Sequence, residues 1–565
     1  MSFSRGIRVI SRRAFIGSSL AATVAAAGPY SPAAPTQKQS TFIDLLRTPD
    51  LVTAYAGLQQ RIPLEKSSRR FAARNIVVDF AEQQSGLDAY LVSPDLALTH
   101  LHARWRAKID EGLLCFGDDW ERSYGTLCWH PMVPERVMPW YFATYDRQCL
   151  HGYGVKTGAA ALCFWQIDPE GVSLWMNVSN GGDGVELASR SLHLATVVTR
   201  EGKEGEEPLA ALRALCGQMC PAMWPSQGAV WGVNDWYYAY GRNSAQMLLE
   251  MTDIAVDLAP ARGPKPFTVV DDGWKDGSST FPSMAEFASS VRKKGARPGI
   301  WIRPMLAGLK TPPDLLLSAR RFGDRTERAR ETAFDPTIPE AMERVLEKVK
   351  QVASWGFELI KHDYSTYDLL GKWGNEMGPS PTHSGWGFHD RTRTNAEIIR
   401  DLYESIRLAA GDPIQILGCN TVGHLSAGLF EMQRTGDDTS GKDWERTRRM
   451  GVNTLAHRLC QHGTFFQLDA DCVALTRDVP WSLTRQWLDV VARSKTVLFI
   501  SPDPSVVGPE QKNALREAFA LLAADAGPAE AASVFHGTTP EIWRSKGGEK
   551  QYSWSGTEGA SPFPL

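Results

Sequence analysis

The chain has 565 residues, which is too long for one hydrophobic core and predicts two or three domains. Its 61 basic and 64 acidic residues give a formal net charge of −3, and this balance argues against nucleic acid as a partner. The 19 tryptophans fit either core packing or stacking against the apolar faces of sugar rings, and composition does not separate the two.

Residues 1–27 carry the pattern of an export signal. Arg12 and Arg13 precede a short, alanine-rich apolar run, and the surrounding residues resemble the core of a twin-arginine signal. The small residues that end the run predict cleavage after Ala27, followed by a tether over residues 28–41. The run is too short and too moderately apolar to favour a permanent membrane anchor. We therefore expect a periplasmic or secreted protein without a stable membrane anchor.

The nine cysteines are odd in number and scattered along the chain, which argues against a disulfide framework. A twin-arginine substrate folds before export in a reducing compartment, so free thiols are expected. Cys216 and Cys220 would lie on one face of a helix, but no second ligand pair is near them in sequence, so packing is favoured over metal binding. No metal and no cofactor is implied.

Residues 42–225 contain mostly short β-like runs. Polar and apolar residues alternate in 161–167 and in 172–178, and Gly, Asp and Pro separate such runs. This pattern predicts an N-terminal β-sandwich domain over residues 42–225, with one helix near residues 207–220 leading to the next domain.

From residue 226 to residue 530, strand-like runs alternate with helical ones. The predicted strands cover residues 229–234, 267–271, 299–303, 358–363, 414–419, 429–434, 465–469 and 496–500. The predicted helices cover residues 244–258, 340–355, 395–410, 444–461, 481–494 and 510–524. Eight strand–helix units predict an α/β fold of the (β/α)8 TIM-barrel type, whose functional residues follow the C-terminal ends of the strands.

Two intervals of this region depart from the regular alternation. The gap between the fifth and sixth predicted strands has room for a short helix only. The long interval after the fourth strand, residues 365–393, is expected to shape a substrate pocket. It contains Trp373, His383, Trp386 and His389. Residues 531–565 hold two possible strands, 532–535 and 551–554, which predict a short C-terminal β extension.

The fourth predicted strand ends in Lys361, His362 and Asp363. Residues two apart on a strand point to the same face, so Lys361 is expected beside Asp363, while His362 points away and packs. An ammonium group next to a carboxylate favours the ionised form, which a nucleophile at neutral pH requires. A structural ion pair is the plainer alternative, but a carboxylate that ends an apolar parallel strand favours catalysis by Asp363.

A second pair of acids follows the sixth predicted strand. Asp437 and Asp438 are adjacent there, shortly after Arg434. One acid could protonate a leaving oxygen and then activate water, because a neighbouring negative charge helps a carboxyl group to hold its proton. Either residue could instead cap a helix. We assign acid/base catalysis to Asp437 and keep Asp438 as the alternative.

Asp271, Asp272 and Trp274 follow the second predicted strand. Paired carboxylates accept hydrogen bonds from vicinal hydroxyl groups, and an indole stacks on a sugar ring, so the segment suits sugar recognition. Metal binding by this pair lacks a third ligand in sequence. The charged run 118–122 of the β-rich region could add to the pocket, although a charged surface turn is the simpler interpretation.

These segments together resemble the melibiase-type α-galactosidases of glycoside hydrolase families 36 and 27. The resemblance covers most of the chain, from the β-rich part to the end of the barrel. It implies that Asp363, two residues after Lys361, is the nucleophile. It also implies that Asp437, in the Arg-x-Gly-Asp stretch that begins at Arg434, is the acid/base.

The resemblance further implies a set of sugar-binding residues. The expected substrate-binding residues are Asp271, Asp272, Trp274, Trp301, Arg303, Lys361, Cys419 and Arg434. Three departures from the family pattern leave the sugar specificity open. Arg303 stands where the family carries a carboxylate, residues 420–424 replace a Gly-rich turn, and the adjacent acids after Arg434 are closer to the raffinose-synthase-like branch.

We therefore expect a retaining exo-α-glycosidase, in the first place an α-galactosidase that acts on oligosaccharides or other glycosides through a covalent glycosyl-enzyme. This mechanism predicts that the two carboxyl groups lie about 5–5.5 Å apart, or somewhat more in an empty site. Three alternatives stay open: an α-N-acetylgalactosaminidase, a raffinose-synthase-like α-galactosyl transglycosidase, and a periplasmic glycan-binding protein. A homo-oligomer also stays open.

Overall fold

The structure is a computed structural model that describes residues 41–57, 59–221, 228–261, 263–325, 331–524, 527–556 and 559–560. The predicted signal, and the predicted tether except for its last residue, lie outside these ranges. Among the described helices, none combines the length and the apolar character that crossing a bilayer requires. All nine cysteines are free thiols, and Cys216 and Cys220 are both buried, as the packing interpretation predicts.

The first part of the chain forms antiparallel β-structure. Its strands are β1 (Leu51–Ala56), β2 (Gln60–Ser67), β3 (Arg70–Ala73), β4 (Ile76–Gln83), β5 (Gly86–Val92), β6 (His100–Arg106), β7 (Leu114–Gly117), β8 (His130–Pro131), β9 (Met138–Pro139), β10 (Tyr141–Tyr145), β11 (Leu150–Val155), β12 (Leu162–Asp168), β13 (Gly171–Asn177) and β14 (Leu192–Arg200). The residues of strand β4 alternate between buried and more exposed positions. One face of such a strand packs inward while the other meets solvent.

These fourteen strands form one continuous sheet in the order β8-β7-β10-β11-β14-β5-β4-β3-β2-β1-β6-β13-β12-β9. Strand β2 pairs with β1 through residues 60–64 and with β3 through residues 65–67, so the sheet passes from one half to the other along β2. Contacts of β10 with β12 and of β7 with β9 bring the two halves together again. The prediction of a β-rich first part is confirmed, in the form of one large antiparallel sheet.

Helix α1 (Pro208–Met219) follows this sheet and packs on β11. Leu215 and Met219 on its buried face press against Gly152 and Gly154 of the strand. A Cβ added to either glycine would come within 2.7 Å of Leu215 or within 2.4 Å of Met219. The two glycines therefore allow a close approach of helix and sheet, and the predicted helix at this place is confirmed.

The second part of the chain is a parallel sheet. Its strands are β15 (Trp231–Asn234), β16 (Phe267–Val270), β17 (Arg297–Ile302), β18 (Leu359–His362), β19 (Gln415–Gly418), β20 (Met432–Arg434), β21 (Gln467–Asp469), β22 (Val473–Leu475) and β23 (Leu498–Pro502). Strands β15 to β21 pair in chain order, and β15 also pairs with β23. A bridge between Asp469 of β21 and Val497, next to β23, links the two ends of this order. All eight predicted strands are present, and β22, which pairs with β23, is a further strand that was not predicted.

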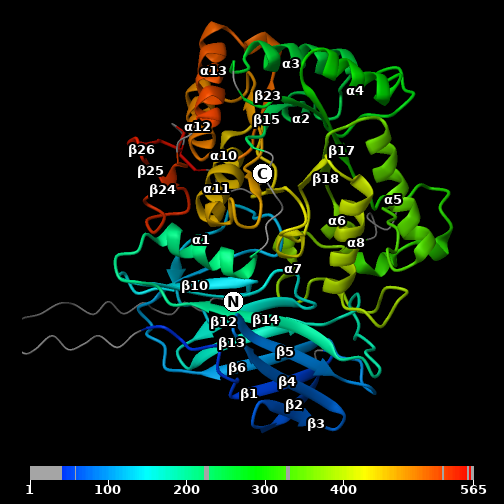
Figure 1. Ribbon diagram of the computed structural model, residues 1–565, viewed down its shortest axis with the longest axis vertical. Coiled ribbons are helices and arrows are strands. Elements are labelled where there is room, and N and C mark those ends of the chain that lie inside the picture. Colours follow the sequence, from blue (N-terminus) through cyan, green and yellow to red (C-terminus); the bar gives the residue numbers. More distant parts are fainter. Residues whose placement is uncertain are drawn as a thin grey trace, which may run out of the picture. The chain divides into compact units, whose positions relative to one another are not determined.

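Helices lie between most of these strands. They are α2 (Trp236–Ala239), α3 (Ala245–Asp257), α4 (Met284–Lys293), α5 (Pro339–Ser354), α6 (Ser365–Leu370), α7 (Gly374–Met377), α8 (Asn395–Ala410), α9 (Gly423–Ser426), α10 (Trp444–Thr447), α11 (Thr454–Arg458), α12 (Trp481–Arg493) and α13 (Pro509–Ala523), with 3₁₀ turns at Pro313–Leu315, Ala319–Phe322 and Pro504–Val506. Figure 1 shows α3, α4, α5, α12 and α13 outside the parallel strands. Apolar residues three or four positions apart give each such helix one inward face, as in α5, which buries Val345, Val349 and Val352. The short helix predicted between the fifth and sixth strands is α9.

The helix predicted over residues 444–461 is not regular. It begins as α10, widens into a π-helical turn over Arg448–Asn453, and continues as α11 and a 3₁₀ turn. The widened turn lies against the end of β20, where a Cβ on Gly436 would come within 2.1 Å of Met450 O. The helix thus departs from the α-form at the place where the backbone next to Asp437 packs against it.

The C-terminal extension is a three-stranded antiparallel sheet of β24 (Glu530–Ala531), β25 (Ile542–Ser545) and β26 (Gly548–Gln551). The predicted strand over 532–535 is wrong, and of the strand predicted over 551–554 only its first residue is in β26. Tyr552 and Trp554 instead stack at a ring distance of 4.8 Å and are buried in the core formed by α12 and α13. Their alternating pattern therefore reflects packing and not strand pairing.

Candidate active site

The C-terminal ends of neighbouring parallel strands carry the predicted site residues to one edge of the sheet. Asp271 follows β16, Asp363 follows β18, and Asp437 lies just beyond β20. Trp301, near the end of β17, is in register with Lys361 of β18. Because parallel strands end at the same edge, residues far apart in sequence meet there.

Asp363 is fixed by two hydrogen-bond donors and is 8% exposed. Trp301 Nε1 donates to one carboxylate oxygen at 3.0 Å, and the amide of Tyr364 donates to the other at 2.7 Å. Tyr364 has a φ of 66°, which a residue other than glycine seldom adopts, and its amide reaches the carboxylate in this conformation. The turn after β18 therefore orients the predicted nucleophile.

The predicted ion pair of Lys361 forms with a different carboxylate. The ammonium of Lys361 binds Asp271 Oδ2 at 2.8 Å, and both side chains are buried. Asn234 Nδ2 donates to the same oxygen at 2.7 Å, and the amide of Asp272 donates to Asp271 Oδ1 at 2.9 Å. Lys361 and Asp271 thus belong to a buried network, and Asp272 is the exposed member of the predicted pair.

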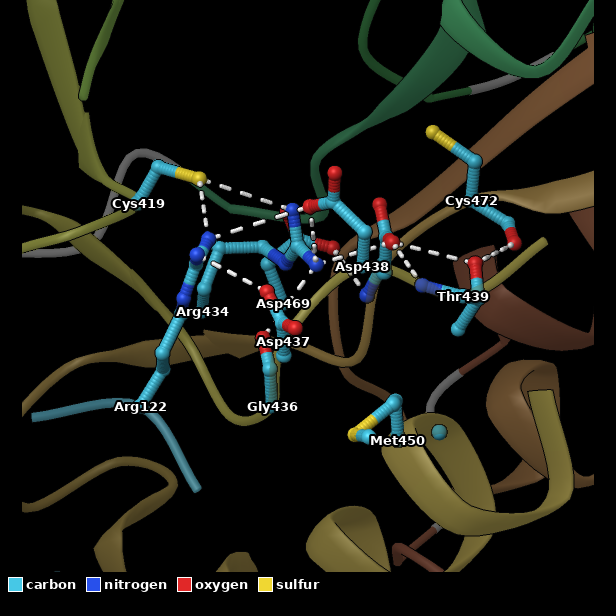
Figure 2. Close-up of polar contacts among 12 residues, drawn as sticks. Arg122, Cys419, Arg434, Gly436, Asp437, Asp438, Thr439, Met450, Asp469 and Cys472 are labelled. Atoms are coloured by element: carbon cyan, nitrogen blue, oxygen red, sulfur yellow. Dashed lines mark hydrogen bonds and ion pairs between the residues drawn. The ribbon is translucent and has the colours of Figure 1, made fainter. Parts of the chain in front are cut away.

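Asp437 lies between two guanidinium groups. Arg122 Nη2 binds its Oδ1 at 2.8 Å, and Arg446 Nη2 binds its Oδ2 at 2.8 Å. Figure 2 shows Arg122 reaching this carboxylate from the antiparallel part of the chain. Both oxygens of Asp437 are therefore engaged in ion pairs.

Asp438 is held less tightly than Asp437. Its Oδ1 lies 3.4 Å from Arg434 Nη2 and 3.7 Å from Arg122 Nη1, and its side chain is 35% exposed. The two ion pairs of Asp437 are shorter, at 2.8 Å each. Burial acts to raise the pKa of Asp438, but the charges of Arg434 and Arg122 outweigh burial and hold this pKa below its ordinary value. Asp438 is therefore the less tightly held carboxylate of the two.

Cys419 lies between two guanidinium groups of the same cluster (Figure 2). Arg434 Nη1 is 3.6 Å and Arg122 Nη1 is 3.5 Å from the sulfur, and Arg434 also forms an ion pair with Asp471 at 2.8 Å. Burial raises the pKa of the Cys419 thiol, and the nearby Asp363 carboxylate raises it further, while the two arginines act in the opposite direction. Asp363 thus acts on the same thiol that Arg122 contacts.

Arg303 takes part in a buried ion cluster. Its Nη2 lies 2.6 Å from Asp368, which is fully buried, and 2.9 Å from Glu331. Its guanidinium lies over the ring of Tyr364 at 4.2 Å. The arginine at the end of the third strand therefore neutralises Asp368 and supports the residue that orients Asp363.

A hollow of about 750 Å³ opens beside the two acids. This volume lies within the range of ~300–1,000 Å³ that ligand pockets span. Asp437, Asp438, Tyr364 and Trp373 line the hollow, and Asp363 is not among its lining residues. Of the four aromatic and imidazole residues noted in the long interval, Trp373 lines this hollow, whereas His383 lines a separate, smaller one.

The charged run 118–122 enters this site, so its interpretation as a surface turn is wrong. Asp118, Glu121 and Arg122 are all buried. Sequence reasoning missed Arg446 as well, because an arginine in a helix that follows a predicted strand carries no distinguishing signal. For Arg122 the unusual concentration of charge next to Trp120 was the one available sign.

The fold and the site together are typical of one class of protein. A large antiparallel sheet precedes a parallel sheet, and the parallel sheet gathers carboxylates at the C-terminal ends of its strands. Sites of this kind in parallel α/β folds are typical of enzymes that bind small polar substrates.

No protein-family model matches the chain. Solved α-galactosidases have a similar structure. An α-galactosidase from Thermus thermophilus in complex with p-nitrophenyl α-D-galactopyranoside is 18% identical, with a TM-score of 0.57 over 85% of this chain and 97% of that one. A family GH36 α-galactosidase from Geobacillus stearothermophilus is 13% identical, with a TM-score of 0.57 over 88% of this chain and 78% of that one. An α-galactosidase from Lactobacillus brevis is 15% identical, with a TM-score of 0.51 over 84% of this chain and 70% of that one.

At these identities the comparisons establish the fold. The chain has the fold of the GH36 α-galactosidases, a mixed α/β architecture with a large antiparallel and a parallel sheet. The resemblance predicted from the motifs is confirmed at this level.

Proposed function

We propose that this protein is a retaining exo-α-glycosidase, and specifically an α-galactosidase that releases terminal α-galactose from oligosaccharides or other glycosides. The antiparallel strands then form the predicted β-sandwich over residues 42–225, and the parallel strands form a closed (β/α)8 barrel over residues 226–530. The bridge between Asp469 and Val497 supports barrel closure, because it joins the two ends of the strand order.

In the proposed reaction, Asp363 attacks the anomeric carbon while an acid of the Asp437–Asp438 pair protonates the departing oxygen. The bond from the anomeric carbon to this oxygen breaks, and a covalent glycosyl-enzyme forms. The acid that gave up its proton is now a carboxylate and takes a proton from a water molecule. This water attacks the anomeric carbon and breaks its bond to Asp363, which releases the sugar with its anomeric configuration retained. Asp437 is the first assignment for the acid/base, and the longer ion pairs of Asp438 keep Asp438 as the alternative.

One observation carries the proposal: acids follow two strands of the parallel sheet at the same edge. Asp363 follows β18 and Asp437 lies just beyond β20, and the strand between these two, β19, ends next to Cys419, which Arg122 joins to Asp437. Two carboxylates at the C-terminal edge of a parallel sheet supply the nucleophile and the acid that retaining cleavage needs. The choice of galactose is supported by the similar α-galactosidase from Thermus thermophilus, whose structure was solved with a nitrophenyl galactoside and with stachyose.

Turnover of a panel of nitrophenyl glycosides tests the proposal. We expect hydrolysis of the α-galactoside, no hydrolysis of the β-galactoside, and α-galactose as the product first seen by proton NMR. Hydrolysis of the α-N-acetylgalactosaminide alone would move the assignment to that sugar. Binding of α-galactosides without turnover would support a glycan-binding protein instead.

A second candidate function is transfer of the galactosyl unit to another sugar. Besides the two acids, the hollow is lined by residues between 119 and 126 and by Arg446, Arg449 and Met450, and its volume of about 750 Å³ leaves space for an acceptor. With raffinose as donor and an excess of a second sugar, a transferase yields a new oligosaccharide, whereas a hydrolase yields free galactose. Chromatography of the products separates the two.

We also propose that the protein is exported by the twin-arginine route, on the evidence of its first 27 residues. Replacement of Arg12 and Arg13 by Lys should retain the protein in the cytoplasm, as cell fractionation measures. Unchanged export of this variant would contradict the assignment of the signal.

A further inference from the structure

A segment of the antiparallel part reaches the end of β20 and pairs with it. The segment covers residues 118–124 and follows β7. The amide of Ser123 donates to Thr435 O at 2.9 Å, and the amide of Asp437 donates to Ser123 O at 2.8 Å. Ser123 and Gly436 thereby form a parallel bridge. The backbone on both sides of Gly436 is therefore held by a segment from the antiparallel part of the chain.

The segment is anchored by buried contacts on both sides of Arg122. Asp118 forms an ion pair with Arg458 at 2.7 Å. Glu121 accepts hydrogen bonds from the amide of Gly374 at 2.8 Å and from Asn420 Nδ2. Arg458 Nη1 also donates to Thr435 O at 3.0 Å, so one arginine contacts both the segment and the strand end. These contacts leave the backbone at Arg122 little freedom.

The side chain of Arg122 connects three groups of the site. Its guanidinium binds Asp437 at 2.8 Å, lies 3.7 Å from Asp438 and 3.5 Å from Cys419 Sγ, and is 8% exposed. It also lies 5.5 Å from the ring centre of Trp373, which lines the hollow. A planar guanidinium can hold several acceptors at fixed angles, which a lysine ammonium cannot do.

We propose that Arg122 is a positioning residue of the active site, which fixes the two acids after β20 in the orientation that protonates the leaving group, and that the antiparallel part of the chain thereby completes the site. This inference rests on the proposed glycosidase function. Arg122, which also lines the hollow, acts in this role through its ion pairs with Asp437 and Asp438.

A positioning role has kinetic consequences that a merely structural ion pair does not have. Proton donation matters most when the leaving group is a poor one, so misplacing the acid slows cleavage of a phenyl galactoside more than that of a dinitrophenyl galactoside. The charge of Arg122 also helps to hold the pKa of Asp438 low. If Asp438 is the acid/base, removal of this charge should also move the high-pH limb of kcat/KM to higher pH, because the carboxyl group then keeps its proton longer.

The experiment compares wild type, Arg122→Lys and Arg122→Met on galactosides of increasing leaving-group ability, with the pH profile of each. For Arg122→Met we expect a loss on the order of 10²-fold in kcat on the phenyl galactoside, and a loss below about tenfold on the dinitrophenyl galactoside. Arg122→Lys keeps the charge without the fixed geometry and should fall between. Arg104→Met is the matched control, because Arg104 forms a comparable ion pair with Asp168 at 2.7 Å in the same antiparallel sheet and does not line the hollow.

Three outcomes are decisive. Wild-type dependence on the leaving group and an unchanged pH profile in both Arg122 variants would overturn the positioning role. An equal loss on all substrates, accompanied by the same loss of thermal stability as in Arg104→Met, would assign Arg122 to folding alone and would also overturn it. A wild-type protein that cleaves no α-glycoside would overturn the proposed function, and this inference with it.

Discussion

Lys361 and Asp271 form an ion pair with a distance of 2.8 Å between Nζ and Oδ2, and their side chains are 8% and 4% exposed. Lys361 is in β18 and Asp271 follows β16, and strand β17 lies between these two strands. Asp271, which the motif assigned to sugar hydroxyl groups, thus has its Oδ2 bound to Lys361 and Asn234 within the protein. The pair joins two strand ends of the site to each other, and Asp363 rests on other donors.

Replacement of Lys361 should therefore lower the stability of the folded protein. A buried ion pair that loses one partner leaves an uncompensated charge, which costs about 3–5 kcal/mol. We expect Lys361→Met to lower the free energy of unfolding by this amount, as urea denaturation measures. Lys294→Met is the control, because Lys294 pairs with the exposed Asp253, and surface pairs contribute below about 1 kcal/mol. Equal effects of the two variants would contradict the structural role of the buried pair.

Replacement of the nucleophile should remove catalysis without unfolding the protein. Asp363→Asn keeps an oxygen that can accept a hydrogen bond from Trp301 or Tyr364 but cannot form the glycosyl-enzyme. We expect kcat on a nitrophenyl α-galactoside to fall at least about 10³-fold. Added azide should restore turnover with β-galactosyl azide as the product. Asp253→Asn, an exposed change, should leave kcat unaltered. A kcat of Asp363→Asn equal to that of the wild type would remove Asp363 from the mechanism.

Azide also distinguishes the two acids after β20. A variant that lacks the acid/base still forms the glycosyl-enzyme from a substrate with a good leaving group, and azide then releases α-galactosyl azide. We expect Asp437→Asn to show this rescue and Asp438→Asn to lose activity without it. Rescue of Asp438→Asn alone would move the acid/base role to Asp438, in agreement with its longer ion pairs. NMR of the azide product is the measurement.

Stability should decline between mildly acidic and neutral pH. Burial, together with the charge of the nearby Asp271, raises the pKa of Asp235 to about 7. A carboxyl group whose pKa is higher in the folded than in the unfolded state stabilises fully below about pH 4, and its contribution is lost as the pH rises to about 7. Each such group lowers the free energy of unfolding by at most about 1.4 kcal/mol per pH unit in this window. Burial also raises the pKa of Glu121 to about 7.

The variant Asp235→Asn isolates the contribution of Asp235. It removes the titrating group. The part of the chain that the structure describes offers no hydrogen-bond partner to Asn243 Oδ1, so the Asn243 amide can turn to accept from the new side chain. The slope of unfolding free energy against pH should therefore be shallower than in the wild type. Urea denaturation at several pH values measures this slope. A slope equal to that of the exposed control Asp253→Asn would show that Asp235 does not titrate in this window.

The elements of this fold could be predicted because their signals are local. Apolar runs such as residues 358–363 mark buried parallel strands, and residues such as Val345 and Val349 mark the inner face of a helix. His362 was predicted to pack, and it is fully buried against Tyr403 and Phe430, with its pKa lowered by burial to about 4. The C-terminal strands were misplaced because an alternating aromatic pattern is also produced by side chains that cover a helix pair.

The partners of the site residues could not be predicted in the same way. That Lys361 binds Asp271, and that Arg303 is neutralised by Asp368, depends on how strands far apart in sequence are arranged around one interior. A spacing of two residues shows that Lys361 and Asp363 share a face, but it does not show which carboxylate on that face is nearer.

The sequence by itself determined the order of strands and helices, the positions of the acids at strand ends and the glycosidase-like motifs, because each depends on residues close together in the chain. The tertiary structure alone decided that Arg122 meets Asp437 across more than 300 positions. It also decided that the ion pairs of Asp438 are longer than those of Asp437. Ion pairs of this kind are set by the packing of two sheets against each other, and no local pattern of residues encodes that packing.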